Sequence, residues 1–182
     1  MRLSRLVAVL SLLFFCASVP ALAKDDRSGV GLGFTSGIVD SDLLFEEINF
    51  LGYTVFWKFG FTDTWGLLVS YRDMEDDDIL LFGEEDDYTQ FGVHAVYMWR
   101  HGKRMRPHVK FGLAHTDLEG TGPFPTISDD AVGLSIGGGF EAGSDRVAFY
   151  ADYDFTAPEM EFGGFEDDVL FFNLNLGMIF KY

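Results

Sequence analysis

Hydrophobic and polar residues alternate along most of the chain beyond residue 28, with a period of two. Such alternation places successive side chains on opposite faces of an extended strand. We therefore expect strands at about 29–36, 48–59, 65–74, 88–99, 131–142 and 169–182, and two more around 108–114 and 147–155. The pattern predicts an all-β protein with eight strands.

The C-terminal strand shows the alternation most clearly. Its large apolar face comprises Leu170, Phe172, Leu174, Leu176, Met178, Phe180 and Tyr182, and its other face carries Asn173, Asn175, Gly177 and Lys181. The apolar face ends in an aromatic residue at the last position, where a soluble domain more often frays into polar residues. We infer that this face meets an apolar environment.

Short and long connections alternate between the expected strands. The short ones fall near 60–64, 100–106 and 143–146, and the long ones near 37–47, 73–87, 117–130 and 156–168. An up-and-down meander with short turns at one end and long loops at the other is typical of outer-membrane barrels, whose termini lie in the periplasm. The pattern of connections therefore predicts a membrane barrel.

A water-soluble barrel of the lipocalin kind is the main alternative, because it is also secreted, eight-stranded and up-and-down. It would have to turn the large apolar face inward, and the interior of eight strands is barely wide enough for side chains. We therefore expect an eight-stranded antiparallel up-and-down transmembrane β-barrel, with its bulky face toward lipid and its glycine-rich face toward a narrow lumen.

Residues 1–23 have the composition of a cleaved secretory signal peptide. Two arginines precede a short apolar run that ends in the cleavage site Ala21-Leu22-Ala23. The run is too short for a membrane anchor. We expect one mature domain, the barrel, at 24–182. Cys16 is the only cysteine, so the mature domain has no thiol with which to form a disulfide.

The end of the chain resembles the C-terminal assembly signal of bacterial outer-membrane barrels. Asn175, Gly177, Phe180 and Tyr182 match its pattern of a polar residue, a glycine and two later apolar residues. With the meander, this makes the chain similar to the small eight-stranded barrels that include the OmpA membrane domain, OmpX, OmpW and the opacity-like porins. The resemblance implies a monomer in the bacterial outer membrane, in contact with lipid and lipopolysaccharide and inserted by the barrel assembly machinery.

Aromatic residues gather at the strand ends next to the short connections. Trp57, Phe59, Trp65, Trp99 and Tyr182 all fall there. Amphipathic rings favour the boundary between membrane and water. We expect these residues to form an aromatic girdle.

Acidic residues dominate the charge and are unevenly placed. The chain has 29 Asp and Glu against 13 Lys and Arg, which excludes nucleic acid as a partner. The four long connections hold 22 of these acids and no Lys or Arg. Such runs keep loops solvated, and their carboxylates also predict weak binding of divalent cations, because no EF-hand spacing is present. The apolar segment 79–82 among them is a candidate contact for a partner.

Charged residues of both signs fall on the glycine-rich face of the expected strands. Lys58, Arg72, Lys110 and Lys181 can face Glu141, Asp152 and Asp154. Buried charges need partners, so we expect these side chains to form a network that plugs the lumen. A small gated pore is the alternative.

Catalytic and metal chemistry have little support. The histidines recur every seven residues, at His94, His101, His108 and His115, but these positions do not converge in a hairpin. We therefore expect no metal site and no cofactor. A lipid A-modifying enzyme would need a nucleophile and a base at the outer rim, where His115, Asp117 and Ser128 are the nearest candidates.

The sequence thus favours a non-enzymatic outer-membrane barrel that displays acidic external loops and serves envelope integrity or adhesion. A narrow channel for ions or small apolar molecules is the alternative, and lipid A modification is a third hypothesis. Fold alone does not decide among these roles.

Overall fold

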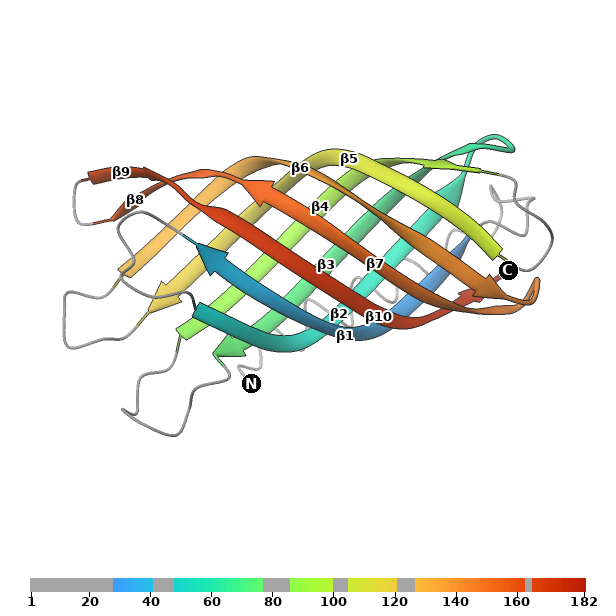
Figure 1. The fold of residues 1–182 in the computed structure, drawn as a ribbon, viewed down its shortest axis with the longest axis horizontal. Coiled ribbons are helices and arrows are strands. Elements are labelled where there is room, and N and C mark those ends of the chain that lie inside the picture. Colours follow the sequence, from blue (N-terminus) through green and yellow to red (C-terminus); the bar gives the residue numbers. More distant parts are fainter. Residues whose placement is uncertain (1–27, 41–47, 77–85, 100–104, 121–126, 163–164) are drawn as a thin grey trace.

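The computed structural model describes residues 28–40, 48–76, 86–99, 105–120, 127–162 and 165–182. Eight strands form a closed antiparallel barrel (Figure 1), as the sequence predicts. They are β1 (Gly29–Asp40), β2 (Ile48–Gly60), β3 (Trp65–Asp76), β4 (Asp86–Met98), β5 (Met105–Gly120), β6 (Ile127–Gly143), β7 (Val147–Ala157) and β10 (Leu170–Lys181). Two short strands, β8 (Glu159–Phe162) and β9 (Phe165–Asp168), pair with each other outside the barrel.

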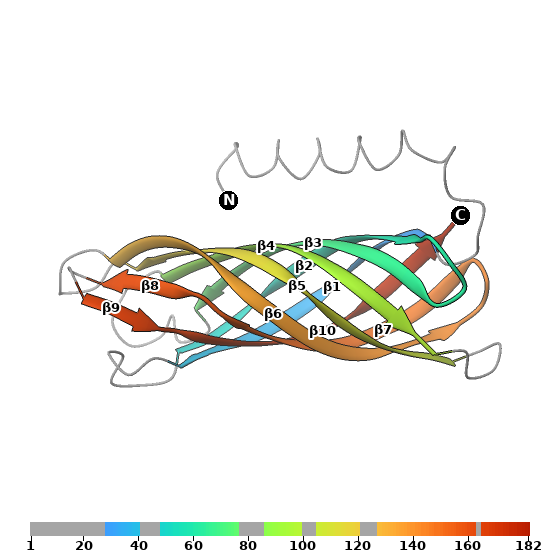
Figure 2. The same ribbon diagram turned by 90° about the horizontal axis from the view of Figure 1, so that it is seen from above.

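The barrel closes where its first strand meets its last. β1 pairs with β10 along its whole length, from Gly29 opposite Lys181 to Asp40 opposite Leu170. The backbone N–H of Tyr182 donates to the Ser28 carbonyl at 3.2 Å and extends this ladder by one step. Each barrel strand therefore has a neighbour on both sides, so the barrel has no open sheet edge along its shared length. The strands run obliquely around the axis (Figure 2).

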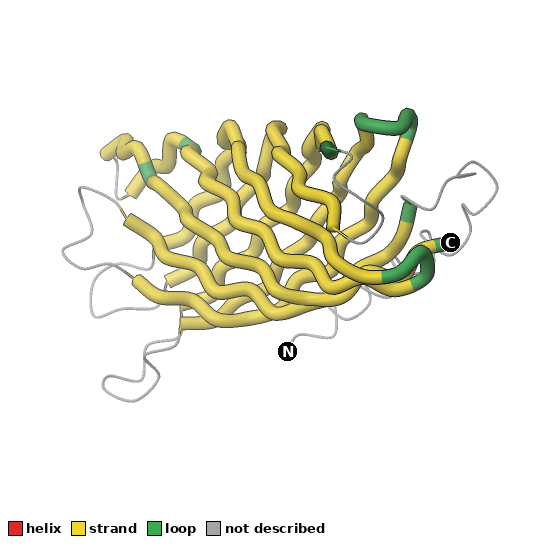
Figure 3. Tube along the Cα trace, turned by 45° about the vertical axis from the view of Figure 1, so that its right-hand side comes forward, coloured by secondary structure: helices red, strands yellow, loops and turns green. Residues whose placement is uncertain are grey.

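The two ends of the barrel differ, and we name them by their connections. The short-turn end carries the turns at 61–64 and 144–146 and the C-terminus (Figure 3). The long-loop end is the one at which β1, β3 and β5 end and near which the β8–β9 hairpin lies. The predicted signal peptide and the apolar segment 79–82 lie outside the described residues. No helix among the described residues is long and apolar enough to cross a membrane.

Burial alternates along the strands and separates two faces. Phe34 and Leu134 are 76% and 75% exposed on the outer wall, whereas Asp154 and Arg72 are 0% and 2% exposed inside. The outward face is the large apolar one, as the pattern predicts. This arrangement suits a barrel whose wall meets lipid, because a water-soluble barrel turns its apolar side chains inward.

β5 and β6 are longer than the sequence predicts. They pair from Met105 opposite Ala142 to Gly120 opposite Ile127. Much of the expected loop 117–130 is therefore strand, and Ser128 lies in β6 opposite Glu119 rather than in a loop. The predicted strands are too short because the alternation of apolar and polar residues inverts here. Leu118 is buried in the lumen while its neighbours on the outer face are acidic, so the apolar face no longer points outward.

The expected loop 156–168 contains the β8–β9 hairpin, in which Glu159 pairs with Asp168. Pro158 separates this hairpin from β7. Proline has no N–H to continue the ladder, although its carbonyl accepts the N–H of Val169 at 3.1 Å. The proline therefore ends β7, and the chain returns to the barrel at β10.

Candidate functional site

Side chains in the lumen form two apolar clusters and two charged groups. The first, the long-loop cluster, is apolar and consists of Val39, Phe50, Met74, Tyr88, Leu118, Met160, Val169 and Phe171. The Tyr88 ring stacks on Phe171 with their centroids 5.0 Å apart, and Phe50 lies against Tyr88 at 5.5 Å. This cluster fills the lumen beneath the long loops.

The second group, the short-turn cluster, is also apolar and lies toward the other end. It consists of Phe56, Leu68, Val96, Met98, Ala148, Tyr150 and Ile179. The rings of Phe56 and Tyr150 lie 4.4 Å apart. Neither cluster is predicted from the sequence pattern, in which the lumenal face is rich in glycine.

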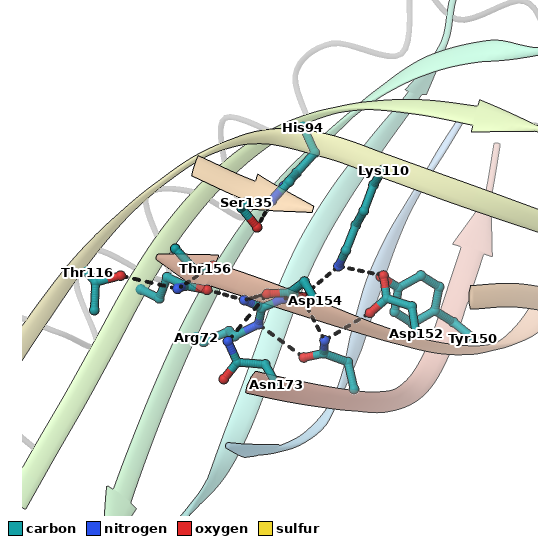
Figure 4. A network of polar contacts seen from close by, with 12 residues as sticks. Arg72, His94, Lys110, Thr116, Ser135, Tyr150, Asp152, Asp154, Thr156 and Asn173 are labelled. Carbon is teal, nitrogen blue, oxygen red and sulfur yellow. Dashed lines mark hydrogen bonds and ion pairs between the residues drawn. The ribbon is translucent and has the colours of Figure 1, made fainter. Parts of the chain in front are cut away.

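The third group is polar and is organised by Arg72 (Figure 4). The guanidinium of Arg72 donates two hydrogen bonds to the Asp154 carboxylate, with Nη2–Oδ1 and Nη1–Oδ2 distances of 2.5 and 3.0 Å. Its Nε donates to Asn175 Oδ1 at 3.1 Å. Nη1 also donates to Gln90. This two-pronged geometry is the arrangement in which a guanidinium binds a carboxylate most strongly.

Lys110 links the two carboxylates on β7. Its Nζ lies 2.6 Å from Asp152 Oδ2 and 2.8 Å from Asp154 Oδ1. Asn175 Nδ2 donates to Asp152 at 2.9 Å, and the hydroxyl of Tyr150 also donates to Asp152. Two cations thus balance two buried carboxylates, which meets the requirement that buried charges be paired.

The polar group contacts both apolar clusters. Asn173 donates to the Tyr88 hydroxyl at 3.4 Å in the long-loop cluster. On the other side, Tyr150 belongs to the short-turn cluster and bonds Asp152. The Arg72 network therefore lies between the two apolar clusters in the lumen.

Lys58, Glu141 and Lys181 form a smaller charged group. Lys58 pairs with Glu141, and Lys181 Nζ lies 3.5 Å from Glu141 Oε2. The structure thus brings the seven expected lumenal residues together in two sets. The contacts of the amides Gln90, Asn173 and Asn175 with this network were not predicted, although the alternation places all three on the lumenal face.

The histidines do not share a site. His94 Nε2 lies 2.9 Å from Ser135 Oγ in the lumen, and His108 Nε2 is 3.6 Å from Asp152. His115 lies on the outer wall with its Nε2 3.8 Å from Asp130 Oδ2, and His101 falls outside the described residues. Across the described part of the chain, no three His, Cys, Asp or Glu side chains are placed to hold a metal ion.

Acidic residues face one another on the outer wall near the long-loop end. Glu75 lies opposite Asp87 in the ladder, Asp87 lies opposite Glu119, and Asp117 lies opposite Asp130. Like charges directly opposite in a ladder are destabilising. Their placement makes the outer wall acidic along β3 to β6.

Aromatic residues form a girdle around the short-turn end, as the sequence predicts. Trp57 Nε1 donates to the Tyr182 hydroxyl at 2.6 Å. Tyr97 lies between Trp65 and Trp99, with centroids 5.1 Å from each. Aromatic rings of this kind favour the boundary between membrane and water.

The four residues of the C-terminal motif split between the two faces. Asn175 is buried in the lumen, whereas Phe180 and Tyr182 are exposed outside. Gly177 lies opposite Gly33 in the β1–β10 ladder, and a Cβ atom at Gly177 would lie 2.3 Å from the Leu32 carbonyl oxygen. The glycine thus allows close approach of the closing strands. Recognition by an assembly machinery remains a prediction.

Comparison with protein families finds a match to the outer membrane protein beta-barrel domain over residues 7–180. A search of curated protein sequences finds no match. Among solved structures, Neisserial surface protein A is similar with 13% identity and a TM-score of 0.70, covering 85% of this chain and 97% of that one.

Two further solved structures share the fold. Ail, the attachment invasion locus protein of Yersinia pestis, has 17% identity and a TM-score of 0.64, covering 87% of this chain and 99% of that one. OprG from Pseudomonas aeruginosa has 13% identity and a TM-score of 0.52, covering 88% and 99%.

Proposed function

Because the chain belongs to the outer membrane protein beta-barrel domain family, we propose that it is a non-enzymatic surface barrel that presents an acidic long-loop end to the exterior. Barrels of this class place short turns in the periplasm and long loops outside. The long-loop end would therefore face the surroundings of the cell, where it serves adhesion or envelope integrity.

The packed lumen carries this proposal. Arg72, Lys110, Asp152 and Asp154 fill the middle of the barrel, and an apolar cluster lies on each side of them. Eight strands leave little space beyond that needed for side chains. A barrel filled in this way favours a structural role over transport.

The acidic wall supports contact with positively charged molecules. Glu75, Asp87 and Glu119 lie in adjacent strands, and the four long connections contain no Lys or Arg. A surface whose charges are all negative attracts positively charged partners, and salt weakens this attraction. The same carboxylates would bind divalent cations weakly and bring the wall close to lipopolysaccharide phosphates.

Capture of a cationic polymer tests this proposal. The protein, folded in nonionic detergent micelles, is expected to bind polylysine at low salt and to release it as salt rises. Replacing Glu75, Asp87 and Glu119 by glutamine should weaken this binding. The control is Asp145→Asn, which removes an exposed acid at the short-turn end. Equal losses in both variants would contradict a role for the acidic wall.

A narrow channel is the alternative function, and the packed lumen argues against it. OprG and Ail are similar at 13% and 17% identity, which supports a shared fold and carries no role to this chain. Lipid A chemistry has no geometric support either, because Ser128 lies opposite Glu119 while His115 lies opposite Val132, four positions away on β6.

A further inference from the structure

The neighbouring strands β3 to β6 (Figure 1) carry rows of directly opposite residues on their outer wall. Nearest the long-loop end, the first row consists of Glu75, Asp87 and Glu119, and the second of Asp73, Thr89, Asp117 and Asp130. The third row consists of Tyr71, Phe91, His115 and Val132, and the fourth of Val69, Val93, Leu113 and Leu134. Acidic rows therefore give way to apolar and aromatic rows at one boundary that crosses four strands.

The chain supplies almost no positive charge to the acidic rows. The only Lys and Arg residues in β3 to β6 are Arg72, Arg106 and Lys110, and the long connections contain none. Arg72 and Lys110 are buried in the lumen, and Arg106 lies near the short-turn end. Within the four rows only His115 can become a cation, and its Nε2 lies 3.8 Å from Asp130 Oδ2. Most of the balancing charge must therefore come from outside the chain.

The apolar rows need a different kind of cover. Leu113, Val132 and Leu134 are 53%, 62% and 75% exposed. Side chains two positions apart along a strand are separated by about 7 Å, so the acidic and apolar rows follow each other at that spacing. A membrane lipid joins a polar headgroup to acyl chains over such distances, whereas a dissolved cation would touch the acidic rows alone. The surface thus continues the lipid-facing wall.

We propose that these four rows bind a membrane lipid whose headgroup carries a primary ammonium group. Its acyl chains lie against the third and fourth rows, and its ammonium group donates charge-assisted hydrogen bonds to carboxylates of the second row. The same carboxylates repel an anionic headgroup. This inference uses the acidic wall of the proposed function and adds the class of lipid that the wall selects.

Quenching of a fluorophore by lipids with brominated acyl chains measures which lipid lies at the surface. Cys16 is the only native cysteine, so a Cys16→Ser background allows one label at Val93→Cys in the fourth row. The protein is folded into phosphatidylcholine vesicles with a chelator, which keeps divalent cations off the carboxylates. Brominated phosphatidylethanolamine should be enriched near the label about fivefold over brominated phosphatidylglycerol, the effect of one charge pairing at a membrane surface. Phosphatidylcholine, whose quaternary ammonium has no N–H to donate, should fall between them.

The double variant Asp117→Asn with Asp130→Asn should remove most of this preference. Asp73 is a poorer choice, because it accepts the Tyr53 hydroxyl at 2.6 Å and is only 7% exposed. Asp40→Asn is the matched control, since Asp40 is an exposed acid at the long-loop end of β1, outside the four rows. It should leave the preference unchanged. Folding of each variant is checked by gel mobility before and after boiling.

A label at Leu174→Cys, on the outer wall of β10, should report no preference among the three lipids. Equal quenching by these lipids at Val93→Cys would overturn the proposal, as would an undiminished preference in the double variant. Polylysine binding without any lipid preference would show that the wall meets a soluble cation, which contradicts this inference and leaves the proposed function intact. A lipid preference without polylysine binding would support the inference and contradict the proposed function.

Discussion

Phe56 occupies the space that a side chain at Gly31 would need. A Cβ atom at Gly31 would lie 1.9 Å from Cζ of the Phe56 ring. The two residues are directly opposite in the β1–β2 ladder, both at lumenal positions. The glycine on one strand thus makes room for the aromatic ring on the next, and the ring anchors the short-turn cluster.

Gly31→Ala should destabilise the barrel. The Phe56 ring would have to move, and overpacking of this kind costs about 1–3 kcal/mol. Denaturant unfolding followed by gel mobility measures the effect. Gly37→Ala is the control, because its Cβ would meet the ends of two side chains, Asn173 Oδ1 at 2.8 Å and Met74 Sδ at 3.4 Å. Equal costs in both variants would contradict the role of Phe56.

Arg72→Met should lower the free energy of unfolding by about 3–5 kcal/mol, because it leaves Asp154 buried with less compensating charge. The double exchange Arg72→Met with Asp154→Leu should recover much of the lost stability, because it removes both members of the pair. Denaturant unfolding of the single and double variants gives the comparison. A double variant less stable than Arg72→Met would show that the ion pair is not the source of the loss.

The unaltered protein should give no unitary conductance steps in planar bilayers. Tyr88→Ala with Phe171→Ala should also remain silent, because the Arg72 network and the short-turn cluster still fill the lumen. Protein refolded from denaturant avoids contamination by native porins. Regular steps of current through the unaltered protein would contradict this prediction and support the channel hypothesis.

Trp57→Phe and Tyr182→Phe should each lower the free energy of unfolding by about 0.5–1.5 kcal/mol, the usual net contribution of one hydrogen bond. The two side chains are partners at 2.6 Å. The double variant should therefore lose little more than either single one. Additive losses in an unfolding experiment would show that the two residues act independently.

Phe180→Asp tests the C-terminal assembly motif. Phe180 is exposed on the outer wall, so its exchange leaves the lumen unaltered. We expect insertion into the outer membrane of cells to fail, while the purified variant still refolds in detergent. Phe180→Leu should insert normally. Failure of Phe180→Asp in both settings would indicate a folding defect rather than a lost assembly signal.

The sequence predicts the outer wall well and the lumen only in part. Residues that face lipid keep a strict alternation, so the eight barrel strands and their outward faces were recognisable. Phe56 is flanked by Val55 and Trp57, and a continuous apolar run does not show which of its side chains point into the lumen. Lys58 and Glu141 lie on β2 and β6, which are not neighbours in the barrel, so only closure of the sheet brings them together.

The inversion of polarity along β5 has a consequence for where the protein sits in the membrane. Leu113 is exposed and apolar outside, but two steps further His115 and then Asp117 occupy the same face while Leu118 turns inward. A displacement of the barrel along its axis toward the membrane centre would draw these polar groups into hydrocarbon, where they are costly. The amino-acid order of β5 thereby limits how deeply this end of the barrel can enter the membrane.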